Sequence, residues 1–168
     1  INVGLILASL KMDADTIIAG LLHDVVEDCE ISLKTVKKEF GTNVAKLVDG
    51  MTKLLQLDDK LKDQSQAEYF QKMALATAED VRVVIIKLAD RLHNLQTIEH
   101  LPRDKQIKKA KETLELYAPL AHQIGMHKMA TDLEDHSFKT IHPFRHNLIE
   151  QALKKNELNR KTLILSLI

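Results

Sequence analysis

The sequence has 168 residues, of which 45% are apolar, and this suits one globular domain of ordinary size with room for a core. Lysine plus arginine equals aspartate plus glutamate at 24 each, so no global field points to nucleic acid or to a membrane surface. The single cysteine, Cys29, excludes an internal disulfide and favours a reducing compartment, and no apolar run approaches the roughly 18 residues of a membrane span. We therefore expect a cytoplasmic protein.

Helical spacing of apolar residues runs through nearly the whole chain and predicts an all-α fold. Residues 1–12 have the pattern of a helix already under way. Asp13 or Asp15 can cap the next helix, because a short acidic side chain accepts hydrogen bonds from the first free backbone N–H groups. This second helix is expected to end near Asp28.

Two short helices are expected next. Ser32 is a good N-cap for the first of them, and Gly41 is a plausible C′ residue that ends it. The second covers residues 43–50, and its inward-facing residues are Val44, Leu47 and Val48. Residues 51–66 carry many charges with little periodicity, which favours a mobile loop with some helical character.

Residues 67–78 return to a helical pattern. The stretch 80–98 is ambiguous, because the β-branched run at 81–86 would locally favour a strand. No partner strand is predicted elsewhere in the chain, and a lone strand is not stable. We therefore predict one long buried helix.

The C-terminal third is predicted to be helical, with breaks at Pro102 and Gly125. The helices are expected, in order, at residues 104–124, at 126–138 and from 143 to about 156. The first of them carries a basic run at Lys105, Lys108, Lys109 and Lys111. This run is typical of a solvated face, with a phosphate-facing role as the alternative.

Side chains with chemistry are concentrated directly after an apolar run. On one continuous helix, His23 would stack on Glu27, and Asp24 would stack on Asp28. Three carboxylates packed this closely repel one another unless a cation, water or raised pKa values relieve the repulsion. A divalent metal is the simplest remedy. The alternative, an acidic helix end that arose by accident, is disfavoured by the helix dipole.

Asp90 is the second predicted source of a metal ligand. It follows a buried apolar run, where an unpaired carboxylate would be costly. The alternative is a structural ion pair with Arg91. His93 is more typical of a hydrogen-bonded, partly buried histidine than of a ligand. A hard divalent cation accepts carboxylate oxygens together with imidazole, so His23, Asp24 and Asp90 form a suitable set.

The remaining histidines give no comparable pattern. His122 and His127 flank Gly125, but no spacing among the C-terminal histidines matches a compact zinc site, and there are no cysteines to complete one. The sequence also lacks a G-x-S-x-G elbow, a Cys/His pair and a glycine-rich phosphate loop.

Two motifs taken together resemble a known family. The His-Asp pair followed by KLAD resembles the HD superfamily of metal-dependent phosphohydrolases. More narrowly, LLHDVVEDCEIS, FGTNVAKLVDGMTKL, IKLADRLHNLQT and ETLELYAPLAHQIGM are similar to the hydrolase domain of RelA/SpoT-type (Rel) bifunctional (p)ppGpp synthetase/hydrolases. The similarity covers residues 1 to about 144. It implies an HD-domain helical bundle with a metal site between helices, bound Mn2+, and removal of the 3′-pyrophosphate of ppGpp or pppGpp in the stringent response.

The resemblance also implies a role for each matching residue. The implied metal ligands are His23, Asp24 and Asp90. The implied catalytic residues are Glu27 and Asp28, without a decision on which of the two donates the proton. The implied nucleotide-binding residues are Asn94 and Thr97.

The resemblance further implies that the hydrolase continues beyond this sequence. A further ligand histidine, in a His-Pro pair, and a basic nucleotide-binding stretch would precede Ile1. We expect residues 1–144 to form the hydrolase domain without its N-terminal part, and residues 145–168 to connect it to a synthetase domain. Two alternatives are another HD-type nucleotide phosphohydrolase and a catalytically silent regulatory HD domain. Neither nucleic acid nor membrane is an expected partner.

Overall fold

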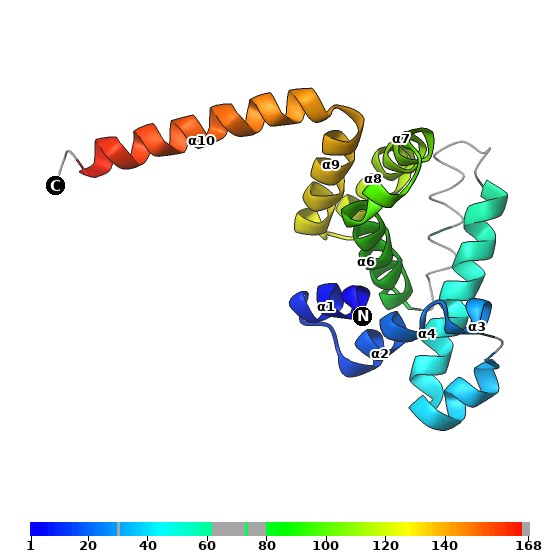
Figure 1. The fold of residues 1–168 in the computed structure, drawn as a ribbon. Coiled ribbons are helices and arrows are strands. Elements are labelled where there is room, and N and C mark those ends of the chain that lie inside the picture. The colour runs from blue at the N-terminus through cyan, green and yellow to red at the C-terminus, as the bar shows by residue number, and fades with distance from the viewer. Residues whose placement is uncertain (30, 62–72, 74–79, 166–168) are drawn as a thin grey trace.

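A computed structural model describes residues 1–29, 31–61, 73 and 80–165, without the side chains of 27, 28, 55–61 and 156–165. The described residues form helices and connecting turns and contain no strand, which confirms the predicted all-α class (Figure 1). The elements are α1 Asn2–Ser9, α2 Ala14–Leu22, α3 Val25–Asp28, α4 Leu33–Leu61, α6 Arg82–Gln96, the 3-10 turn η1 Ile98–His100, α7 Arg103–Glu112, the π-helical segment η2 Thr113–Tyr117, α8 Ala118–Gln123, α9 His127–Ile141 and α10 Pro143–Leu165.

The helix starts near the N-terminus follow the predicted caps. Asp13 is the N-cap of α2, and its carboxylate accepts a hydrogen bond from the backbone N–H of Thr16 at 2.8 Å. The same carboxylate is 2.9 Å from the guanidinium of Arg82, at the start of α6. Ser32 caps α4 by accepting the N–H of Thr35 at 3.2 Å. Both caps therefore act as the sequence predicted.

Helix α4 is longer than predicted. The expected break at Gly41 is present as a kink with φ +90° and ψ 172°, a conformation that a side chain would strain. The expected inward residues Val44, Leu47 and Val48 are buried. The prediction of a loop from residue 51 is wrong as far as Leu61, because Met51 and Leu54 are buried and carry the apolar face onward. The rest of that stretch, 62–66, lies outside the described residues.

Helix α6 lies at the centre of the fold and packs against α1, α2, α4 and α9. The β-branched stretch is helical, as predicted. Packing outweighs the β propensity of these residues, because most side chains of α6 are buried against the neighbouring helices. The helix predicted at 67–78 lies outside the described residues, apart from Met73, which is helical and fully buried.

The predicted helix at 104–124 is divided into three parts. α7 and α8 are α-helical, and the π-helical segment η2 lies between them. Pro119 supplies a physical reason, because a proline has no N–H to donate and its ring disturbs the preceding turn. A single π turn inside a helix is the usual form of such an interruption.

The last two helices differ in their surroundings. α9 packs against α6, α7, α8 and η2, whereas α10 packs on α9 and extends away from the other helices (Figure 1). α10 runs to Leu165, beyond the predicted end near residue 156. Its exposed apolar residues are Phe144, Leu148, Ile149 and Leu153. Among the described residues, no helix combines the length and the apolar character that a membrane span requires.

Candidate metal centre

The His-Asp pair forms a turn between two helices. α2 ends at Leu22 and α3 begins at Val25, so His23 and Asp24 lie outside regular helix. Asp24 occupies the N-cap position of α3 but makes no capping hydrogen bond with its side chain. Histidine and aspartate are both poor interior helix formers, which is consistent with the break. The prediction of one continuous helix through this stretch is therefore wrong.

The imidazole of His23 is held in a defined orientation. Its Nδ1 lies 2.8 Å from the carbonyl oxygen of Gly20, and since a carbonyl only accepts, Nδ1 is the donor. The other ring nitrogen, Nε2, lies 2.9 Å from Asp24 Oδ2 and 3.5 Å from Asp90 Oδ1. The side chain is 13% exposed. This backbone hydrogen bond is the kind that fixes the tautomer of a metal-binding histidine.

Asp90 brings α6 to the same point. Its carboxylate is 16% exposed and accepts a hydrogen bond from Asn94 Nδ2 at 2.9 Å, one helical turn onward. The ammonium of Lys87, one turn earlier, lies 3.8 Å from the second carboxylate oxygen. Among the described residues, the polar neighbours of this carboxylate are His23, Asn94 and Lys87.

Arg91, the alternative partner of Asp90, points elsewhere. Its guanidinium lies 3.0 Å from Glu112 on α7 and stacks on the ring of Tyr117, with 4.0 Å between Cζ and the ring centroid. Only 9% of the Arg91 side chain is exposed. Arg91 thus forms an ion pair with Glu112, and Asp90 is left facing His23.

The charges at this point shift both titrating groups in a consistent way. Burial alone would lower the pKa of His23, but the hydrogen bond to Asp90 and the charge of Asp24 outweigh burial and raise it. Burial would raise the pKa of Asp90, but the hydrogen bond with His23 and the charge of Lys87 lower it. The carboxylates of Asp24 and Asp90 thus favour a positive charge at Nε2 of His23.

The other predicted site residues are placed less completely. Glu27 and Asp28 lie on α3, directly after Asp24, but their side chains are outside the described part of the structure. Asn94 contacts Asp90 directly. Thr97 is the exposed C-cap of α6, and its hydroxyl donates to the carbonyl of His93. The structure therefore brings Asn94, but not Thr97, into contact with the His23–Asp24–Asp90 cluster.

The donor set of this cluster fits a divalent cation. Imidazole nitrogen and carboxylate oxygen are ligands that cations such as Mn2+ accept. Among the described side chains, no group of three His, Cys, Asp or Glu residues is already spread around a common point for a metal. His23 instead contacts the two carboxylates directly.

A family profile described as an HD domain matches residues 1–127. The chain belongs to the HD domain family. Membership implies a divalent metal, without specifying which one. The resemblance of the sequence to the HD superfamily is thereby confirmed, and the helical bundle described above is an HD domain.

Curated relatives narrow the comparison. The chain is 44% identical over 164 residues to the guanosine-3′,5′-bis(diphosphate) 3′-pyrophosphohydrolase of Vibrio cholerae serotype O1, covering 98% of this chain and 23% of that protein. The identity, length and coverage are the same for the bifunctional (p)ppGpp synthase/hydrolase SpoT of Escherichia coli strain K12. A Streptomyces coelicolor protein named GTP pyrophosphokinase is 50% identical over 159 residues, covering 90% of this chain and 18% of that protein. The chain thus spans less than a quarter of the length of these relatives.

The sequence pattern did not single out Lys87 and placed Lys109 in the wrong environment. Lys87 is buried beside Asp90, and its spacing of three residues before Asp90 on one helix could have indicated this contact. Lys109 was expected on a solvated face with Lys105, Lys108 and Lys111, which are indeed exposed. Lys109 is half-buried, and burial together with the charge of Arg91 lowers its pKa.

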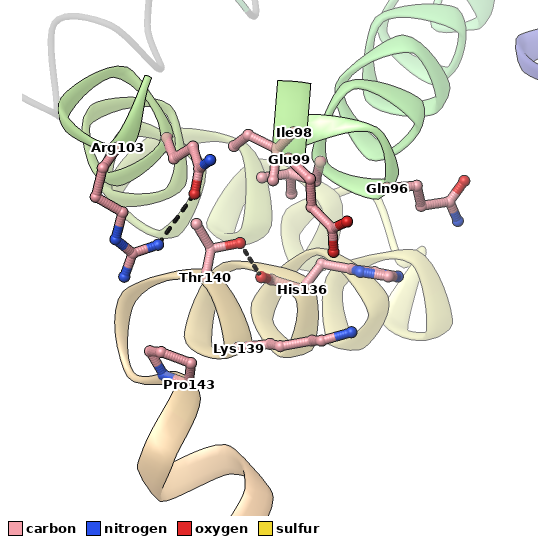
Figure 2. A pocket seen from close by; sticks show the side chains of 10 residues that line it. Gln96, Ile98, Glu99, Arg103, His136, Lys139, Thr140 and Pro143 are labelled. Carbon is pink, nitrogen blue, oxygen red and sulfur yellow. Dashed lines mark hydrogen bonds between the residues drawn. The ribbon is translucent and has the colours of Figure 1, made fainter. Parts of the chain in front are cut away.

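A separate cavity of about 210 Å³ lies between the α6–α7 connection and α9. Figure 2 shows Glu99, Arg103, His136 and Lys139 around it, and Gln96 lines it as well. Arg103 is held by a hydrogen bond to a neighbouring glutamine side chain at 3.0 Å. Of the predicted site residues whose side chains the structure describes, none lines this cavity, so it is distinct from the His23–Asp24–Asp90 cluster.

Proposed function

We propose that this HD domain is a Mn2+-dependent (p)ppGpp 3′-pyrophosphohydrolase, which converts ppGpp or pppGpp to GDP or GTP plus pyrophosphate. The observation that carries the proposal is the meeting of the His23–Asp24 turn with Asp90 of α6, 3.5 Å from His23 Nε2 to Asp90 Oδ1. The relatives named as 3′-pyrophosphohydrolases support the choice of substrate.

In this proposal, His23, Asp24 and Asp90 hold the cation. The proton on His23 Nδ1 is committed to the Gly20 carbonyl, so a cation that displaces the proton from Nε2 would be bound through the Nε2 lone pair. Asp90 is kept in its charged form by its surroundings, which is the form a metal ligand needs. Asn94 fixes the orientation of the Asp90 carboxylate from one side.

The reaction breaks the bond between the 3′ oxygen and the first phosphorus of the 3′-pyrophosphate, and water supplies the new oxygen. A bound divalent cation would lower the pKa of a water ligand and offset charge on the phosphate oxygens. We assign the proton movements to Glu27 and Asp28, which follow the metal-binding turn within one helical turn of chain. One of them would take a proton from water, and the other would give one to the 3′ oxygen.

Substrate contacts are assigned to Asn94 and Thr97. Asn94 lies in the last turn of α6 and Thr97 is the C-cap of the same helix, which also carries Asp90, so this end of α6 would present the nucleotide to the cation. Lys87 is a further candidate for offsetting phosphate charge, because its ammonium is fixed beside Asp90.

We also propose the wider context implied by the relatives. The chain spans less than a quarter of their length, and one of them is named a bifunctional synthase/hydrolase, so residues 145–168 would lead toward a synthetase domain. The free, exposed thiol of Cys29 is compatible with a cytoplasmic location.

The test is product analysis after incubation with ppGpp, using the protein extended upstream of Ile1. GDP plus pyrophosphate, formed with Mn2+ and not with EDTA, is the expected result. Asp90→Asn should abolish turnover and Mn2+ binding while the helical circular dichroism signal stays unchanged. The matched control is Asp104→Asn, at an exposed position on α7, which should behave as the wild type. Stoichiometric Mn2+ binding without turnover would instead indicate another HD substrate or a silent regulatory domain.

A further inference from the structure

Two histidines that the sequence left unassigned meet at the turn between α8 and α9. Gly125 has φ +79°, a left-handed conformation that glycine adopts without strain. The N–H groups of Gly125 and Met126 bond to the carbonyls of His122 at 3.0 Å and Ala121 at 2.9 Å, which is the Schellman pattern at a helix end. α9 then begins at once with His127. The tight turn therefore places the last turn of α8 beside the first residue of α9.

The two imidazole rings face each other at this turn. The Nδ1 atoms of His122 and His127 are 3.4 Å apart, and the ring centroids are 5.7 Å apart with 46° between the planes. On the other side of the His122 ring, Nε2 lies 3.1 Å from a carboxylate oxygen of Glu134, about two turns into α9. Because a carboxylate accepts, this contact holds the proton on Nε2 and leaves Nδ1 of His122 with a lone pair.

This geometry resembles half of a zinc site. Two Zn–N bonds of about 2.05 Å at the tetrahedral angle place the nitrogens about 3.3 Å apart. The observed 3.4 Å is close to that separation. The contact between His122 Nε2 and Glu134 also reproduces the carboxylate–histidine arrangement that orients metal-binding histidines.

We propose that His122 and His127 form a second metal site for an imidazole-preferring divalent cation, with Zn2+ as the best match, and that Glu134 is its positioning residue. Nδ1 of His122 and Nδ1 of His127 supply two of the four ligands, and water fills the other two positions. Imidazole pairs without carboxylate ligands favour Zn2+, Ni2+ or Cu2+ over Mn2+, so this site differs in metal preference from the HD cluster. It does not depend on the proposed hydrolase activity.

The competing explanation is a direct hydrogen bond between the rings, with Nδ1–H of His127 donating to His122. That bond needs no metal and leaves Zn2+ binding unchanged when either histidine is replaced. The two explanations therefore differ in the number of Zn2+ ions bound.

The experiment is a Zn2+ titration of the intact protein against a chromogenic chelator. The variants are His127→Gln, His122→Gln and Glu134→Gln, and the matched control is His100→Gln, at an exposed position on η1. The wild type and the control should bind one more equivalent of Zn2+ than either site-histidine variant. Glu134→Gln should keep the stoichiometry but weaken this site about 10- to 100-fold.

A second readout guards against misfolding. With Co2+ as the probe, the wild type should show visible absorption bands that His127→Gln lacks, while far-ultraviolet circular dichroism of the two proteins coincides. Equal Zn2+ stoichiometry and affinity in the wild type and His127→Gln would overturn the proposal. An equal loss in the His100→Gln control would overturn it too.

Discussion

The buried ion pair between Arg91 and Glu112 gives the sharpest stability prediction. Glu112→Gln keeps the shape of the side chain but removes the charge that faces an arginine with only 9% of its side chain exposed. Breaking one partner of a buried pair costs about 3–5 kcal/mol, whereas a surface pair contributes about 0–1 kcal/mol. Because Glu112 is 24% exposed and the glutamine oxygen can still accept a hydrogen bond, we expect a loss of about 2 kcal/mol in the free energy of unfolding.

The assay is urea denaturation followed by circular dichroism, with thermal melting as a check. For a domain of this size, about 2 kcal/mol corresponds to a fall of about 4–8 °C in Tm. Glu150→Gln is the control, since its partner Lys154 lies 3.2 Å away and the two side chains are 51% and 71% exposed. The control should lose no more than about 0.5 kcal/mol. Equal losses in the two variants would refute the reasoning that burial makes the first pair costly to break.

Three further outcomes are expected. Arg82 donates hydrogen bonds to Asp80 and lowers its pKa, so this pair stabilises the fold above the unfolded-state pKa of about 3.9 and the contribution is lost as the pH falls through the folded-state pKa. Arg82→Gln should therefore flatten the fall in urea midpoint between pH 5 and about pH 3, and an unchanged slope would contradict this. Asn94→Ala removes the hydrogen bond to Asp90 and should weaken Mn2+ binding about 10-fold, measured by electron paramagnetic resonance; unaltered affinity would exclude an orienting role. Gly41→Ala meets no atom within 4 Å but must adopt φ +90°, so it should cost about 1–3 kcal/mol in unfolding free energy, and a neutral effect would show that the kink relaxes.

The elements that the sequence predicted well are those with a local physical signal. The caps Asp13 and Ser32 act within three residues, and Gly41 needs a conformation that other residues avoid. Such signals do not depend on the rest of the fold. The long helix α6 was predicted by a global argument, the absence of any partner strand, which outweighed its β-branched composition.

The predictions that failed needed information about distant contacts. The charge-rich stretch after residue 50 is helical as far as Leu61 because Met51 and Leu54 are buried in the core. The sequence alone does not indicate which distant residues cover them. Whether Arg91 pairs with Asp90 or with a residue 21 positions away is likewise a question of packing. His23 and Asp90, by contrast, were predicted as partners in one site, and the structure places them in contact. Their roles as metal ligands stay predictions.

The π-helical segment η2 has a consequence for how this chain can change in length. A π turn holds more residues than an α turn, so Tyr117 reaches the Arg91 guanidinium only with the present number of residues after Glu112. Deleting or inserting one residue there would rotate every later side chain of α8 by about 100° around the helix axis. Single substitutions leave the direction in which these later side chains point unchanged. The segment should therefore accept changes of residue type far more readily than changes of length, and this can be checked in variants that gain or lose one residue.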